Sequence, residues 1–168
     1  MVGRMRKPCL FVAVLFVWAL TACGRQATSE DALAAGRAHL EAGEYVEAVA
    51  DLEAAVAADP SNTEARFALG QAYFHTGDLE KAVTEFRTVL ATDPDHAAAH
   101  HNLGVTYFQM RNPHAALAEF QAALELDPDD PHTHYQLGAT YLALAFPSLD
   151  PNAPPDPQRL EQATAEFQ

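Results

Sequence analysis

A period of 34 residues runs through most of this chain and limits the folds that it can adopt. Residues of one type recur at that spacing: Gly36, Gly70, Gly104 and Gly138; Pro60, Pro94 and Pro128; Tyr73, Tyr107 and Tyr141. A period of this length indicates a repeat array, in which each unit packs against its neighbours. We therefore expect a stack of similar units, of which at least three are needed to build a continuous core.

Each unit has the pattern of two helices joined by a short turn. In the unit that starts at Thr63, apolar residues fall at helical spacing over 65–73 and again over 79–90. Between them, Gly77 supplies the left-handed residue that ends the first helix, and Asp78 is expected to cap the second helix with its carboxylate. Each unit is therefore predicted to be a helical hairpin.

The predicted helices follow the repeat period. First helices are expected near 29–42, 63–76, 97–110 and 131–144, and second helices near 45–58, 79–92 and 113–126. In the third unit, Asn112 is expected to cap the second helix, with Pro113 in its first turn. The sequence contains no pattern typical of a β-strand, so the predicted fold class is all-α.

Several positions recur together and resemble the tetratricopeptide repeat. These positions are Leu69, Gly70, Tyr73, Ala82, Phe86 and Pro94, repeated as Leu103, Gly104, Tyr107, Ala116, Phe120 and Pro128. The resemblance implies a right-handed superhelical solenoid of helix-turn-helix hairpins. Its repeats would span 29–62, 63–96, 97–130 and 131–168, with three full repeats and an interrupted, truncated fourth. The first repeat departs from the pattern at Ala35, His39 and Leu52, as is common in a terminal repeat.

The fourth unit is interrupted by a proline-rich insertion near 146–158, after which 160–167 resembles the start of a second helix. An insertion in a repeat array is expected to form an exposed loop, either on a binding face or on an indifferent surface. The sequence ends at Gln168 within that helix. We expect a truncated reading frame or a fragment. A native short form would instead expose apolar surface that pairs with another copy.

The N-terminal residues resemble a bacterial lipoprotein signal. Three cations in the first seven residues precede the uninterrupted apolar run 10–20, which is too short to span a bilayer. The resemblance implies a signal peptide at 1–22, lipidation of Cys23, and a tether at 23–28. The alternatives are an ordinary secretory signal and an uncleaved anchor. Cys9 would be removed with the signal, so no disulfide is expected in the exported domain.

The acidic composition argues against a nucleic-acid partner. The formal net charge is −13, and removal of three cations and no anions with the signal would leave −16. Phosphate neutralisation needs the opposite sign, whereas a cationic protein surface would be attracted. The alternative is that these acids form the solvated outer faces of helices.

The sequence contains no motif for catalysis, and we expect no cofactor. Histidines cluster at His96, His100, His101, His132 and His134, but no carboxylate-rich set with ligand spacing accompanies them. We therefore expect surface histidines rather than a metal site. No glycine-rich phosphate loop or Ser-His-Asp context occurs, so we do not expect an enzyme.

The first helices contain a second stripe at spacings of three and four residues. By the family resemblance, this stripe would line the groove in which a peptide binds. The predicted groove residues are Leu33, Arg37, Leu40, Phe67, Gln71, Phe74, His75, His101, Val105, Phe108, Gln109 and Tyr135. The alternative is that the same aromatic residues only pack between repeats.

The resulting hypothesis is a membrane-anchored scaffold or assembly factor for protein partners in the bacterial cell envelope. The protein would face the periplasm or the exterior, and an outer-membrane location is compatible with Gly24 after the lipidated cysteine. An alternative is the recognition module of a larger envelope enzyme, truncated at Gln168. A small-ligand or metal-binding envelope protein is disfavoured by the missing ligand set. The sequence specifies neither the partner nor the oligomeric state.

Overall fold

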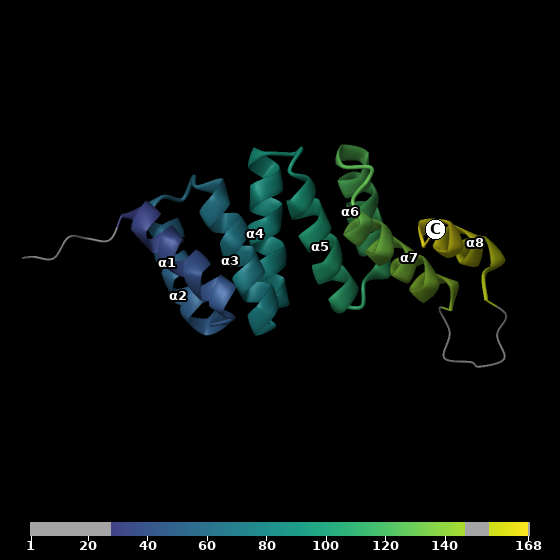
Figure 1. Cartoon of the computed structure of the whole chain (residues 1–168), viewed down its shortest axis with the longest axis horizontal. Helices are drawn as coiled ribbons and strands as arrows, with labels where there is room; N and C mark the ends of the chain where they lie inside the picture. The colour runs from purple at the N-terminus through teal and green to yellow at the C-terminus, as the bar shows by residue number, and fades with distance from the viewer. Residues whose placement is uncertain (1–27, 147–154, 168) are drawn as a thin grey trace, which may run out of the picture.

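The computed structural model describes residues 28–146 and 155–167, which form eight α-helices and no strands. The helices are α1 (Ser29–Ala42), α2 (Tyr45–Ala58), α3 (Thr63–Thr76), α4 (Leu79–Thr92), α5 (Ala97–Gln109), α6 (Pro113–Leu126), α7 (Pro131–Ala145) and α8 (Pro157–Glu166). Consecutive helices pair as four hairpins, and these stack in chain order along the long axis of the molecule (Figure 1). The arrangement is the predicted all-α solenoid.

The predicted helix bounds agree closely with the structure. Of the seven predicted helices, only two differ, because α5 ends at Gln109 rather than at 110 and α7 continues to Ala145 rather than stopping at 144. The signal peptide, Cys23 and 147–154 of the insertion lie outside the described residues. Among the helices that the structure describes, none is long and apolar enough to cross a membrane.

The proline-rich insertion ends earlier in the chain than the sequence suggests. The proline pattern places residues 157 and 158 in it because prolines disfavour helix, but α8 begins at Pro157. Proline is tolerated in the first helical turn, where its missing amide hydrogen would have no partner within the helix. The Asp156 carboxylate accepts hydrogen bonds from the backbone amides of Gln158 and Arg159 and so caps the helix.

Turn chemistry confirms two of the local predictions and contradicts one. Gly77 is left-handed, with φ of 86°, and the Asn112 side chain accepts a hydrogen bond from the backbone amide of Ala115. The predicted Asp78 cap is wrong, because its side chain forms no capping hydrogen bond. The Asp78 carboxylate instead lies 3.2 Å from the ammonium group of Lys81 on the first turn of α4.

Each hairpin is closed by a large side chain that packs against a glycine. A Cβ atom added at Gly70 would lie 2.6 Å from the Phe86 ring. The equivalent pairs are Gly36 with Leu52, Gly104 with Phe120 and Gly138 with Phe167. The buried residues form one cluster over α1–α5 and a second over α6–α8. The glycines therefore admit a large side chain from the second half of each hairpin into the face of the first helix.

Candidate functional site

The first helices of successive hairpins, α1, α3, α5 and α7, carry the predicted groove residues. We call the side of these helices that carries the predicted groove residues the first-helix surface. Four predicted residues, Arg37, Leu40, Phe67 and Gln71, line one cavity of about 380 Å³ between α1 and α3, the α1–α3 cavity. Glu41, Glu64, Ala68 and His96, which were not in the prediction, complete its lining.

Three further predicted residues, Val105, Phe108 and Gln109, line a larger cavity of about 790 Å³. This α5–α7 cavity lies between α5, the turn into α6 with the first residues of α6, and α7. Arg111 and His114, which the sequence prediction missed, also line it. The structure therefore divides most of the predicted groove between two separate cavities.

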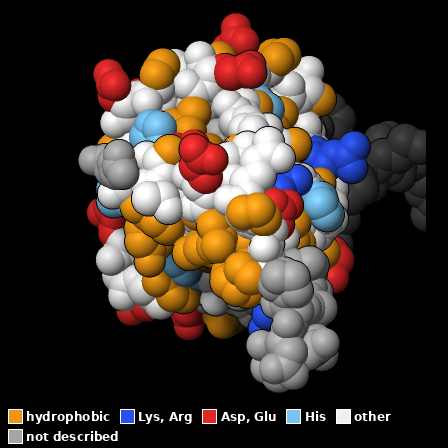
Figure 2. All heavy atoms as spheres, turned by 90° about the vertical axis from the view of Figure 1, so that its right-hand side faces the viewer, with side chains coloured by type: hydrophobic (Ala, Val, Ile, Leu, Met, Phe, Trp, Pro, Cys, Tyr) orange, Lys and Arg blue, Asp and Glu red, His pale blue; other side chains and the backbone are white. Residues whose placement is uncertain are grey.

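Three predicted residues line other hollows. Leu33 is buried at a shallow cavity along α1, and His101 lines a cavity of about 250 Å³ between α5 and α7. Tyr135 is 64% exposed and lines a cavity between α7 and α8. Its ring lies 5.8 Å from that of Phe167, at the C-terminal end of the solenoid, where Figure 2 shows hydrophobic side chains gathered at the surface.

Phe74 and His75 lie outside these cavities. The His75 ring stacks on Tyr45 at the start of α2, with centroids 4.3 Å apart, and meets the edge of Phe74 at 5.4 Å. The stacking of His75 on Tyr45 joins α3 to the preceding hairpin. Phe67 also packs, with its ring 5.8 Å from the buried Phe86. The aromatic residues of the first-helix surface therefore have packing contacts while remaining partly exposed.

The polar groups of the surface differ in their electrostatic environments. Arg37 and Glu64 form an ion pair across the α1–α3 cavity, but both side chains are more than half exposed, so the pair contributes little to stability. His101 is more enclosed. Burial lowers its pKa, and the nearby charge of Asp130 opposes that shift only in part. Its Nδ1 atom lies 2.7 Å from the hydroxyl of Thr133.

His96, predicted to be a surface histidine, has a structural role at the start of α5. The Nδ1 atom of His96 accepts a hydrogen bond of 3.1 Å from the backbone amide of Ala99, so His96 caps the helix. Across the part of the chain that the structure describes, no three His, Cys, Asp or Glu side chains are arranged to hold a metal ion.

One cavity residue that the sequence prediction missed, Arg111, could have been found from the repeat pattern. Arg111 occupies the repeat position at which the two preceding repeats have Gly43 and Gly77. All three residues have positive φ, and Arg111 is the only non-glycine residue with positive φ among those described. An arginine at a left-handed turn position was therefore visible in the repeat pattern.

Comparisons with known proteins agree with this architecture. One tetratricopeptide repeat model matches residues 39–104, and a second matches residues 97–130. A comparison with curated proteins gives no match. Among solved structures, a crystal structure of MamA superposes with a TM-score of 0.73 at 20% identity, covering 90% of this chain and 80% of that one.

Two other solved structures show the same fold. MamA from Desulfovibrio magneticus RS-1 has a TM-score of 0.72 at 20% identity, covering 84% of this chain and 73% of its own. The first tetratricopeptide repeat domain of Spaghetti (RPAP3), bound to an HSP90 peptide, has a TM-score of 0.66 at 24% identity, covering 73% of this chain and 99% of its own. The family matches span more than half of the chain and coincide with its stacked hairpins. The chain is therefore a solenoid of tetratricopeptide repeats.

Proposed function

We propose that this protein is a scaffold that binds protein partners on its first-helix surface. One observation carries the proposal: apolar side chains of successive hairpins remain partly exposed where they line open cavities. Leu40 and Phe67 line the α1–α3 cavity, and Val105 and Phe108 line the α5–α7 cavity. Partly exposed aromatic groups beside a few polar ones are typical of recognition sites.

The peptide complex of the Spaghetti domain supports this choice, since a protein of the same fold binds a peptide. The charge of the chain favours partners that present a cationic group to the α1–α3 cavity. Glu41 and Glu64 line that cavity, and only Arg37 offsets them. A positive group on a partner would be attracted over a distance of about 10 Å at ordinary ionic strength.

We further propose that the solenoid is anchored by lipid at Cys23 and works in the bacterial cell envelope. The support is the sequence before the first helix, in which cations precede the apolar run 10–20 and Cys23 follows it. Two or three acyl chains on one cysteine would hold the protein stably on a membrane.

The test is crosslinking of the full-length protein in host membranes, followed by mass spectrometry. Leu40→Asp and Phe108→Asp place a charge in each cavity, and we expect each to lower recovery of the partner by at least about tenfold. Val46→Asp is the matched control, because Val46 is 72% exposed on a second helix. Circular dichroism would establish that each variant is folded.

Unchanged partner recovery by folded Leu40→Asp and Phe108→Asp variants would overturn the binding role. The anchor is tested in the same preparations. Cys23→Ala should move the protein from the membrane fraction to the soluble fraction and abolish labelling by a radioactive fatty acid. Persistent labelling of this variant would rule out lipidation at Cys23.

A further inference from the structure

The α5–α7 cavity differs from the other hollows of the first-helix surface in size and in charge. Its apolar walls come from Val105 and Phe108 on α5 and from Leu144 and Phe146 at the end of α7. A volume of about 790 Å³ falls within the range of ligand pockets in proteins. The cavity therefore has room for apolar side chains of a partner.

The polar lining of this cavity is neutral or cationic. Gln109 and Gln136 contribute amides that can both donate and accept hydrogen bonds, and Arg111 and His114 contribute nitrogen donors. No carboxylate of a described residue lines the cavity. In a chain with a formal net charge of −13, this is a local exception.

The backbone of Arg111 provides a second, independent observation. Its φ is 60°, a conformation in which the Cβ atom of an L residue is crowded, whereas the equivalent Gly43 and Gly77 adopt φ of 76° and 86° without that penalty. The turn itself would be better served by glycine. Strained residues of this kind concentrate at ligand sites, and the guanidinium group is what an arginine adds here.

We propose that the α5–α7 cavity binds an acidic side chain of a partner protein together with an apolar side chain next to it. Arg111 pairs with the carboxylate, for which its planar guanidinium group offers two parallel donors. Val105, Phe108 and Leu144 enclose the apolar neighbour. The two glutamine amides are available to the partner's backbone.

This inference rests on the proposed binding function and specifies the partner's chemistry. The α1–α3 cavity, with Glu41 and Glu64 in its lining, favours a cationic group, whereas the α5–α7 cavity favours an anionic one. A partner segment that carries a basic residue and an acidic–apolar pair is therefore held in one direction along the solenoid. Opposite charges at the two cavities disfavour the reversed orientation.

The test uses the full-length protein in detergent and a library of random heptapeptides joined at their C-termini to a phage coat protein. Such peptides carry no free terminal carboxylate, so only side chains can supply the negative charge. We expect the wild-type protein to enrich peptides with Asp or Glu next to an aromatic or aliphatic residue. A selected peptide, made with blocked ends, should then bind about threefold to fivefold more weakly to Arg111→Gly, the loss expected for an ion pair of an exposed arginine.

Arg111→Gly is informative because it should not damage the fold. Glycine is the residue of the two preceding repeats at this position, so the melting temperature should equal or exceed that of the wild type. Arg87→Ala is the matched control, because Arg87 is an exposed arginine on α4 and its loss changes the net charge equally. Binding of the selected peptide should stay within about twofold in this control.

The outcomes separate this inference from the proposed function. Selected peptides that lack acidic residues, or that bind Arg111→Gly as tightly as wild type, would overturn the inference and leave the binding function in place. A selection that enriches no peptide would overturn both.

Discussion

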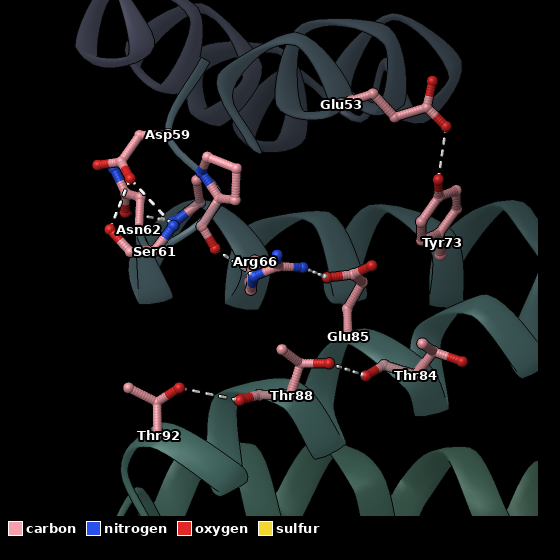
Figure 3. A network of polar contacts seen from close by, with 12 residues as sticks. Glu53, Asp59, Ser61, Asn62, Arg66, Tyr73, Thr84, Glu85, Thr88 and Thr92 are labelled. Carbon is pink, nitrogen blue, oxygen red and sulfur yellow. Dashed lines mark hydrogen bonds and ion pairs between the residues drawn. The ribbon is translucent and has the colours of Figure 1, made fainter. Parts of the chain in front are cut away.

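One basic residue in each of the last three repeats ties the start of a repeat to its second helix. In the second repeat, Arg66 donates from Nη1 to the Glu85 carboxylate at 2.9 Å and from Nε to the Pro60 carbonyl at 2.9 Å (Figure 3). The Arg66 and Glu85 side chains are only 21% and 16% exposed. The guanidinium group therefore bridges a backbone carbonyl and a carboxylate on the second helix.

Histidine replaces arginine at this position in the next two repeats. His100 contacts Glu119 through Nδ1 at 2.7 Å and the Pro94 carbonyl through Nε2 at 3.1 Å; His134 contacts Glu166 at 2.7 Å and the Pro128 carbonyl at 2.8 Å in the same way. A neutral imidazole has only one N–H group, so it can donate to only one of the two acceptors. Both contacts are satisfied only by the doubly protonated ring.

The stability of the fourth hairpin is therefore expected to depend on pH. Hydrogen bonds to Glu166 and to the Pro128 carbonyl raise the pKa of His134, and the charge of Asp130 acts in the same direction. A raised pKa in the folded state gives stability that is fully present below the unfolded pKa of about 6.5 and is lost as the pH rises through the folded value. Because the pair is partly exposed, we expect a loss below about 1 kcal/mol.

The variant His134→Arg introduces the residue type that the second repeat has at Arg66. Arginine keeps its charge over this pH range, so the variant should lose the part of the pH dependence of stability that comes from His134. Urea unfolding from about pH 6 to about pH 9 would compare the two proteins, and the remaining histidines, including His101, are common to both. Identical pH profiles for the wild type and His134→Arg would contradict the charged state of this histidine.

At the scale of the helices, the pairing of a glycine with a large side chain holds each hairpin together. The rings of Phe86 and Phe120 are fully buried against Gly70 and Gly104. Phe167 occupies the equivalent place against Gly138 but is 47% exposed. The same contact is therefore enclosed inside the array and open to solvent at this end.

Because Phe86 is buried and Phe167 is exposed, the same substitution should lower the free energy of unfolding by different amounts. Phe86→Ala removes a fully buried ring and should lower the free energy of unfolding by about 3–5 kcal/mol. Phe167→Ala should cost about half of that or less, because the hydrophobic contribution scales with the area withdrawn from water. Urea unfolding measures both. Equal costs would mean that Phe167 is covered in the protein in solution.

At the scale of the whole molecule, contacts are confined to neighbouring hairpins. Beyond consecutive helices, the described helices meet only as α1 with α3, α3 with α5, and α5 with α7. Stability in such an array is close to a sum of the stabilities of the units and of the interfaces between neighbours. A local defect should therefore weaken its own end of the solenoid more than the other end.

Leu52→Ala tests this expectation, since Leu52 is fully buried and closes the first hairpin. We expect the free energy of unfolding of that hairpin to fall by about 2–5 kcal/mol. Amide hydrogen exchange read by mass spectrometry should show lost protection in α1 and α2 and little change in α5–α7. A uniform loss of protection over all helices would show that the solenoid unfolds as a single cooperative unit.

Local signals repeated along the chain were sufficient to predict the helices. The second helix of the third repeat illustrates this, because Asn112 and Pro113 set its start by hydrogen bonding and by a fixed φ, which require no distant residue. Gly77 likewise ended α3 as predicted. The clustering of Arg37, Leu40, Phe67 and Gln71 also followed from helical spacing and from the stacking of equivalent helices. Whether these residues bind a partner stays a prediction.

The sequence alone therefore determined the repeat, the hairpins and their order, because hydrophobic period, glycine and proline act within a few residues of the chain. Tertiary structure decided the rest. The Asp78 carboxylate pairs with Lys81 instead of capping α4, and Arg111 lies in the lining of the α5–α7 cavity. The predicted groove residues line separate cavities. The walls of each cavity come from side chains of different repeats. Which of those side chains meet depends on packing across the stack, which no local pattern encodes.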